Sequence, residues 1–276
     1  MKIRRFIIIA TVFILVATTL TGCNLIDKAS QKLGFKNSDF EYIKQNKVDK
    51  VVIQSTRDTG FRFIVSEKNN IKDIYDILSS GKPATTKTSL EADYIFEIHS
   101  GSDVKKFSYV AGLHDNKQGN FYDENKSYVI SKRLDNYIIQ NLSFIRKPRE
   151  FENIYYNSLL KVIENNKSKL DVNGLKVGVD ILGDTECTKY MISVDIDDFK
   201  RRLKEILPSA DIVNKNRENF DVIVSINNYG YKTKTYKSIV TIENRKENSQ
   251  KKFYITGTYD SNWTTSIEEK MPNDWR

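Results

Sequence analysis

Residues 93–110, DYIFEIHSGSDVKKFSYV, decide how the first half of the chain folds. Two β-prone runs flank the turn sequence SGSD at 100–103, and this pattern predicts an antiparallel hairpin. Tyr94, Phe96 and Ile98 occupy alternate positions of the first run, so one side of that strand is expected to be buried. A strand with one buried side needs other elements packed against it.

Further strands and two amphipathic helices are expected around this hairpin. The apolar periodicity predicts strands at 48–55, 61–65, 121–122 and 128–131, and helices at 70–78 and 132–142. Such a succession of strands with two helices is typical of an antiparallel sheet with helices packed on one face.

The second half of the chain repeats this kind of pattern. A helix is expected at 151–163, followed by a polar linker at 164–169. Strands are expected at 175–182, 190–194, 220–226, 236–242 and 253–258, with a helix at 196–207. The predicted fold class is therefore α+β, with two small units, each a mostly antiparallel sheet with helices on one face.

The composition shifts along the chain predict six segments. They are a signal peptide (1–22), a tether (23–46), an N-terminal α+β domain (47–146), a helix and linker (147–170), a C-terminal α+β domain (171–260) and a loosely ordered tail (261–276).

The N-terminal segment has the features of a secretory signal peptide. Lys2, Arg4 and Arg5 precede an apolar run at 6–20. This run is shorter than the roughly 20 apolar residues that a membrane-spanning helix needs, and small residues follow it. The segment therefore predicts export from the cytoplasm.

The sequence Leu20-Thr21-Gly22-Cys23 resembles the lipobox of bacterial lipoproteins. The resemblance implies cleavage just before Cys23 and attachment of a diacylglycerol to the Cys23 thiol. Acyl chains contribute about 0.8 kcal/mol per buried CH₂, so two or three of them hold a protein durably on a membrane. The expected location is the cell membrane, lipid-anchored and facing outside the cytoplasm.

Charge and composition favour an envelope setting. Without the three basic residues of the signal, 41 Lys and Arg face 36 Asp and Glu, a net charge of about +5. Such a field favours approach to an anionic membrane or wall polymer. An exported protein rarely meets nucleic acid and no nucleic-acid recognition motif is present, so no nucleic-acid partner is expected. Abundant Lys, Ile and Asn, which have A/T-rich codons, indicate a low-GC bacterium.

Residues 48–142 loosely resemble the YhfM-like domain of small Firmicute lipoproteins. The resemblance rests on DYIFEIHSGSDVKKFSY followed by FYDENKSYVISKRL. It implies a surface lipoprotein, carries no catalytic signature and supplies no ligand.

Asp195, Asp197 and Asp198 form the densest carboxylate cluster in the sequence. Such a cluster can ligate Ca²⁺ or Mg²⁺. It can equally place negative charge in the first turn of a helix, where the helix dipole favours it. The second interpretation is preferred because no Asp-x-Asp-x-Asp-Gly loop is present, so we expect no metal and no cofactor.

No catalytic residues are predicted. His99 and His114 lie outside any metal-ligand spacing, and nucleophile-elbow, Walker and HExxH motifs are absent from the sequence. Cys187 is left alone once Cys23 is lipidated, and no activating base adjoins it. We therefore expect Cys187 to be a buried or idle thiol.

Aromatic residues around the C-terminal strands are the remaining feature of the sequence that indicates a binding site. Tyr229, Tyr231 and Lys232 lie beside Gly230, which permits an exposed bend, so residues 227–232 are the candidate binding loop. Tyr and Trp with Asn and Lys can bind glycans or form a protein interface, whereas alternating aromatics can also simply fill a sheet core. The aromatics concerned are Tyr229, Tyr231, Tyr236, Tyr254, Tyr259, Trp263 and Trp275.

Two functional hypotheses follow from these observations. The preferred one is a non-catalytic binding or adaptor lipoprotein, whose partner is an envelope protein or an anionic or glycan wall polymer. The alternative is an envelope hydrolase with an unrecognised acid/base site. A cleft that holds two carboxylates with raised pKa values would favour the hydrolase.

Overall fold

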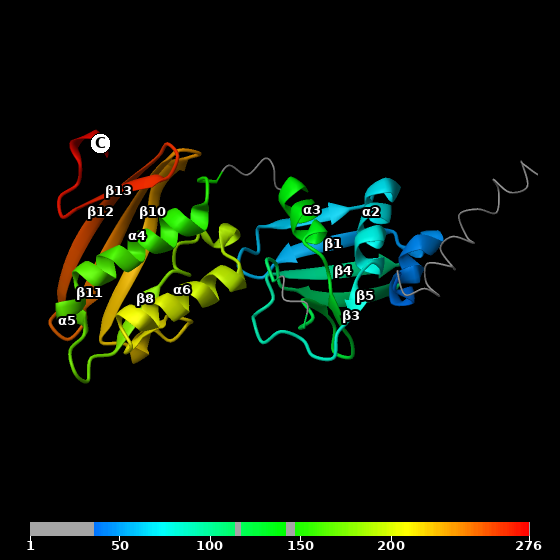
Figure 1. Ribbon diagram of the computed structural model, residues 1–276, viewed down its shortest axis with the longest axis horizontal. Helices are drawn as coiled ribbons and strands as arrows, with labels where there is room; N and C mark the ends of the chain where they lie inside the picture. The colour runs from blue at the N-terminus through cyan, green and yellow to red at the C-terminus, as the bar shows by residue number, and fades with distance from the viewer. Residues whose placement is uncertain (1–35, 114–116, 142–146, 276) are drawn as a thin grey trace, which may run out of the picture.

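Two α+β units lie one after the other along the long axis of the computed structural model (Figure 1). The structure describes residues 36–113, 117–141 and 147–275. A seven-stranded sheet builds the first unit and a six-stranded sheet builds the second. The predicted fold class is therefore confirmed. The signal peptide at 1–22 and Cys23 lie outside the described residues.

The sheet of the first unit is antiparallel throughout its ladder. Its strands, in sheet order, are β2 (Arg62–Val65), β1 (Lys50–Ser55), β4 (Tyr94–Ser100), β5 (Asp103–Tyr109), β6 (Phe121–Tyr122), β7 (Ser127–Val129) and β3 (Lys82–Pro83). The predicted hairpin is formed by β4 and β5, whose register runs from Tyr94 opposite Tyr109 to Ser100 opposite Asp103.

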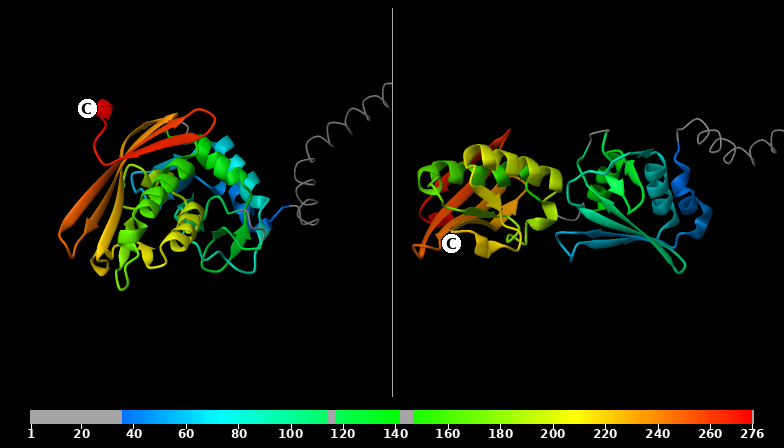
Figure 2. Two further views of the ribbon diagram at one scale, coloured as in Figure 1. Left: turned by 60° about the vertical axis from the view of Figure 1, so that its left-hand side comes forward. Right: turned by 90° about the horizontal axis from the view of Figure 1, so that it is seen from below.

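The helices α2 (Lys68–Ser79) and α3 (Arg133–Asn141) cover one face of this sheet (Figure 2). Their apolar sides meet the buried side of β4 in one core, which contains Ile74, Leu134 and Phe96. The buried positions of β4 alternate along the strand, as the sequence predicts.

The tether expected at 23–46 is shorter than predicted. Residues 38–47 form two short helical segments, η1 (Ser38–Phe40) and η2 (Ile43–Lys47), that pack on the first unit. Phe40 is buried, and its ring centroid lies 4.8 Å from that of Tyr128 and 5.9 Å from that of Phe107. Burial of this ring draws the end of the expected tether into the core.

The sheet of the second unit is mixed. Its strands, in sheet order, are β13 (Trp263–Glu268), β12 (Ser249–Tyr259), β11 (Thr235–Asn244), β10 (Val222–Lys232), β8 (Val177–Asp180) and β9 (Ala210–Ile212). The β10–β8 and β8–β9 pairs are parallel and the others are antiparallel. The helices α4 (Phe151–Asn165) and α6 (Ser193–Ile206) lie on one face (Figure 2).

Several expectations for the second unit differ from the structure. The helix at 147–170 is not a separate connector, because α4 contributes Tyr155 and Leu159 to the core of the second unit. Part of the expected linker forms the one-turn helix α5 (Lys167–Leu170). The strand expected at 190–194 is wrong, since the short helix η3 (Thr188–Tyr190) and the start of α6 occupy this stretch.

The tail at 261–276, expected to be loosely ordered, is built into the second unit. It contributes the edge strand β13 and then the short helix η5 (Asn273–Trp275). Trp275 is only 4% exposed, because its ring stacks on Tyr229 and meets Tyr254 edge-on. These contacts cover part of the sheet face opposite α4 and α6.

In the part of the chain that the structure describes, no helix is long and apolar enough to cross a bilayer.

Candidate functional site

The candidate binding loop at 227–232 is not a loop. These residues extend β10, which pairs with β11 as far as Lys232 opposite Thr235. Gly230, with φ of +142°, follows a register shift and lies in a β-bulge rather than at a turn. The chain reverses at residues 233–234 instead.

The three predicted binding residues do not converge. Tyr229 stacks on Trp275 at 4.8 Å between ring centroids, on the face away from the helices. Tyr231 packs against the core on the helix side, where its hydroxyl lies 2.7 Å from that of Tyr190. Lys232 is exposed at the end of the strand. The structure therefore gives these residues separate packing environments and no shared site.

A groove of about 360 Å³ lies elsewhere in the second unit, between α4 and the start of β13. We call it the α4–β13 groove. The lining residues contributed by α4 recur at helical spacing, so that one face of the helix lines the groove over three turns. The lining residues are Glu150, Asn153, Ile154, Asn157, Ser158, Lys161, Asn262, Trp263 and Thr265.

Polar groups of α4 face this groove with part of their hydrogen-bonding capacity unused. Ser158 is 1% exposed, and its Oγ makes no hydrogen bond to any described residue. Asn153 Nδ2 donates to the Glu150 carboxylate at 3.1 Å, and Asn157 Oδ1 accepts from Arg202 at 2.6 Å. The Oδ1 acceptor of Asn153 and the Nδ2 donors of Asn157 thereby remain for a further partner.

Aromatic contacts hold the β13 side of the groove in place. Trp263 Nε1 donates to the backbone carbonyl of Arg149 at 2.7 Å. The Trp263 ring meets that of Tyr259 edge-on, with centroids 5.3 Å apart. The Tyr259 hydroxyl donates to Glu150 at 3.1 Å. Both walls of the groove are thus tied together at its Glu150 end.

Sequence reasoning missed this groove. The sequence analysis included Tyr259 and Trp263 among the aromatic residues of possible binding function, but it predicted a loosely ordered tail after residue 260. The signal in the sequence was the polar series Asn153, Asn157 and Lys161, which runs at i, i+4 and i+8 beside the apolar stripe of the same helix. Only the pairing of β13 with β12 brings this series next to Trp263.

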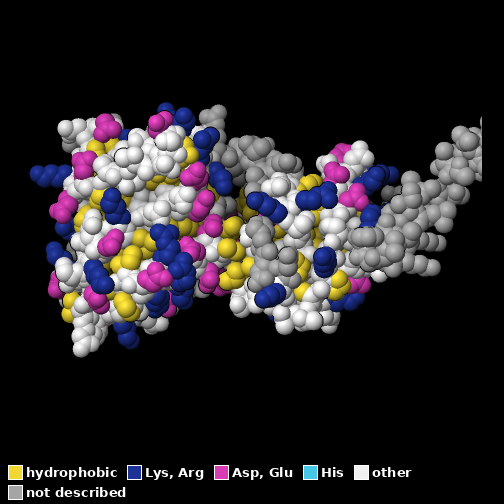
Figure 3. Space-filling view, viewed as in Figure 1, with side chains coloured by type: hydrophobic (Ala, Val, Ile, Leu, Met, Phe, Trp, Pro, Cys, Tyr) yellow, Lys and Arg dark blue, Asp and Glu magenta, His cyan; other side chains and the backbone are white. Residues whose placement is uncertain are grey.

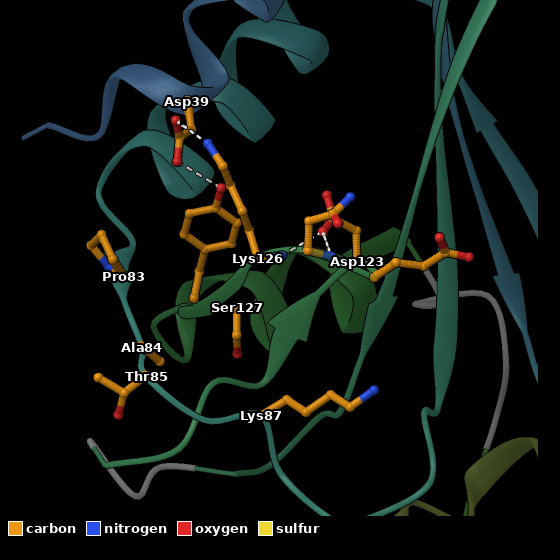
Figure 4. A pocket seen from close by; sticks show the side chains of 11 residues that line it. Asp39, Pro83, Ala84, Thr85, Lys87, Asp123, Lys126 and Ser127 are labelled. Atoms are coloured by element: carbon orange, nitrogen blue, oxygen red, sulfur yellow. Dashed lines mark hydrogen bonds and ion pairs between the residues drawn. The ribbon is translucent and has the colours of Figure 1, made fainter.

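A second pocket, of about 430 Å³, lies in the first unit beside η1 and the β6–β7 turn (Figure 4). Its charged groups already serve the fold. Asp39 accepts from Lys126 Nζ at 2.8 Å and from the Tyr128 hydroxyl at 2.7 Å, and these bonds hold the pKa of Asp39 below its usual value. Asp123 Oδ1 accepts the backbone N–H groups of Asn125 and Lys126. This pocket therefore shows structural contacts rather than a free set of ligands.

The first unit has a relative among known families. Residues 44–148 match the family model of the YhfM protein. This match agrees with the resemblance over 48–142 and ends before α4, so it does not cover the α4–β13 groove. Searches of curated proteins and of solved structures found no match.

Hydrogen bonds from an ion pair of the first unit join the two units. Arg57 Nη1 lies 2.5 Å from Asp93 Oδ1, and these side chains are only 10% and 2% exposed. Asp93 also accepts the backbone N–H groups of Ala111 and, in the second unit, Ser193, each at 2.8 Å. Burial raises the pKa of Asp93, although the positive charge of Arg57 opposes this effect. The junction fixes the start of α6 against the first unit.

The aspartate cluster lies at the start of α6, where the helical interpretation places it, but ionisation of Asp195 is disfavoured there. Asp195 lies in the first turn of α6, and Asp198 pairs with Arg201 one turn further on. Burial, together with the negative charges of Glu152 and Asp93, raises the pKa of Asp195 to about 6. Within the ranges that the structure describes, no group of three or more His, Cys, Asp and Glu residues is placed to hold a metal ion.

The remaining candidate nucleophile, Cys187, is buried. Cys187 is a fully buried free thiol, and its pKa is raised by burial and by the neighbouring Asp184 carboxylate. The prediction of a buried thiol is therefore confirmed. His99 Nε2 lies 3.5 Å from Glu97, and His114 is outside the described residues.

Proposed function

We propose that the chain is a lipid-anchored, extracytoplasmic lipoprotein that acts as a non-catalytic binding module in the cell envelope. The signal-like segment at 1–22 and the lipobox-like LTGC at 20–23 support the anchor at Cys23. Two or three acyl chains on this residue would provide a durable membrane attachment.

The observation that carries the binding role is the position of the α4–β13 groove relative to this anchor. η1 lies at the end of the first unit that is remote from the second unit (Figure 1). Cys23 precedes the first described residue, Lys36, by 13 residues. A lipid on Cys23 would therefore attach the chain through the first unit, and the groove lies in the other unit.

The surface of the second unit is suited to an aqueous setting. Lys, Arg, Asp and Glu side chains are interspersed over the face that α4 and α6 cover (Figure 3). The partner in this proposal is an envelope protein or a wall polymer, and nucleic acid has no part in it.

Metabolic labelling with an alkyne-tagged fatty acid tests the anchor. We expect label on the wild-type chain, none on Cys23→Ala and full label on Cys187→Ala, the matched cysteine control. Equal labelling of wild type and Cys23→Ala would contradict the proposal. Digestion of the second unit by protease added to wall-stripped intact cells tests its outward orientation.

An envelope hydrolase is the second candidate. The observation in its favour is Asp195, whose pKa of about 6 suits a general acid and whose neighbour Glu152 supplies a second carboxylate. Hydrolysis of isolated envelope polymers by the purified chain, abolished in Asp195→Asn, would replace the binding proposal.

A further inference from the structure

We propose that the α4–β13 groove binds a neutral, hydroxyl-rich oligosaccharide. This inference rests on the proposed function of the second unit as a binding module, and it names the chemical class of the ligand. Four features of the groove support it: its charge balance, its unused hydrogen-bonding groups, its aromatic wall and its dimensions.

The charge of the groove is balanced. Glu150 and Lys161 are the charged residues among those that line it, one of each sign, and they lie at opposite ends of the α4 side. A site for an anionic polymer would instead gather several cations. The lining therefore favours an uncharged ligand, even though the chain as a whole is basic.

The polar groups of the groove match hydroxyl groups, which both donate and accept. Asn153 offers its Oδ1 as an acceptor, and Asn157 offers its Nδ2 as a donor. The hydroxyl of Ser158 is a third polar group of the lining, and it is covered in the free protein without a hydrogen-bond partner, which destabilises the free protein. A ligand hydroxyl removes this penalty if the side chains that cover Ser158 Oγ move when the ligand binds.

The aromatic wall adds an apolar surface. The indole N–H of Trp263 is already bonded to Arg149, so the half-buried ring itself is what remains for a ligand. Sugar rings present C–H groups on their faces and hydroxyls at their edges. They can therefore lie against an aromatic ring while they bond to neighbouring amides.

The size and shape of the groove are suitable for a short chain of sugars. Its volume of about 360 Å³ falls within the roughly 300–1,000 Å³ of small-ligand sites. From Glu150 to Lys161 the helix rises about 16 Å at about 1.5 Å per residue, so the groove is elongated.

An extended peptide is the competing ligand. β13 is an edge strand, and a peptide could pair with its open edge. That mode relies on backbone hydrogen bonds and on pockets for alternate side chains. That mode gives Ser158, Asn153 and Asn157 no hydrogen bond to the ligand, so the lining favours the oligosaccharide.

Titration of the full chain with chitotetraose, in a detergent without a sugar headgroup, tests the inference. We expect saturable binding by calorimetry with Kd between about 10 μM and 1 mM. The double variant Asn153→Ala/Asn157→Ala is expected to bind at least about tenfold more weakly. Asn165→Ala, an exposed asparagine of the same helix outside the groove, is expected to bind like wild type.

Ser158→Ala separates a binding role from a structural one. Since it removes an unpaired buried hydroxyl and places a better helix former in α4, we expect Tm to rise while affinity for chitotetraose falls. Unchanged affinity in this variant, together with unchanged affinity in the double variant, would overturn the inference.

Two further results would also overturn it: no binding of chitotetraose, or tighter binding of an extended peptide that competes for the groove. Acylation of Cys23 is measured on the same preparation by mass spectrometry. If the chain is acylated but does not bind chitotetraose, the result contradicts the ligand class alone. If the chain is not acylated, the result contradicts the proposed anchor.

Discussion

Asp93 of the first unit caps a helix of the second. Its Oδ1 accepts the backbone N–H of Ser193, the first residue of α6, at 2.8 Å. The first N–H groups of a helix have no partner within it, and no side chain of the preceding residue, Ile192, serves α6. One buried carboxylate therefore completes a helix start in one unit and an ion pair with Arg57 in the other.

Asp93→Ala is expected to lower the free energy of unfolding by about 3–5 kcal/mol, because it leaves the largely buried Arg57 guanidinium without its counter-charge and the Ser193 N–H without its acceptor. Urea unfolding measures this loss. We also expect the two units to unfold in separate transitions in this variant.

Glu97→Gln is the matched control for that change. Glu97 lies in β4, close to Asp93 along the chain, and pairs with the exposed Lys106 at 2.9 Å. Such pairs contribute less than about 1 kcal/mol. Equal losses in Asp93→Ala and Glu97→Gln would show that the junction does not hold the units together.

Asp195 makes stability depend on pH. Its pKa of about 6 in the folded chain lies above the usual 3.8 of aspartate, so the native state binds this proton more tightly than the unfolded state. The stabilising effect is full below about pH 3.8 and is lost as pH rises through about 6. Asp195→Asn, which cannot ionise, avoids that loss.

We therefore expect Asp195→Asn to be more stable than wild type by about 1–2 kcal/mol at pH 8, after allowance for solvent screening of a half-buried group. The difference should shrink towards pH 4 in urea unfolding series. Asp198→Asn, an exposed partner of Arg201, should show no such gain at pH 8. A constant difference between Asp195→Asn and wild type across this range would disprove the titration.

The ordered tail depends on Trp275. Trp275→Ala removes the stack on Tyr229 and the contact with Tyr254, and we expect it to cost about 2–4 kcal/mol. Trypsin should then cut after Lys270 faster than in wild type. Met271→Ala, at a side chain that is 39% exposed, should leave both stability and cleavage nearly unchanged. Protection of Lys270 in Trp275→Ala would contradict this role.

Cys187 should be chemically inert in the native protein. In a Cys23→Ser variant it is the single cysteine of the sequence. Because burial and Asp184 raise its pKa, we expect its reaction with a disulfide reagent at pH 8 to proceed only at the rate of unfolding. Fast modification of the folded variant would show that the thiol is accessible.

Much of the fold follows from local patterns in the sequence. The alternation at Tyr94, Phe96 and Ile98 is enough to place β4, and the turn after it fixes the hairpin. The strand predicted at 190–194 is wrong, although the apolar residues of this stretch are typical of a strand. Ser193 instead starts a helix whose first N–H is satisfied by Asp93, a residue 100 positions away. No local pattern records such a partner.

The candidate site was harder to predict for the same reason. Tyr229 was predicted to lie in a binding loop, but it lies in β10 and its ring stacks on Trp275, a residue of the tail that was expected to be loosely ordered. Ser158 carries no signal in the sequence at all, since its importance comes from burial without a hydrogen-bond partner. The stack of Tyr229 on Trp275 arises from the docking of the tail onto the second unit.

We propose above all that the second unit binds an envelope component through the α4–β13 groove. Photo-crosslinking on intact cells tests this binding most directly, with a photoreactive residue in place of Asn262, which lines the groove but is assigned no ligand contact, or in place of Asn165 on α4 outside the groove. We predict glycosidase-sensitive adducts from position 262 and none from position 165. Identical adducts from both positions, or no adduct from position 262, would contradict the proposal.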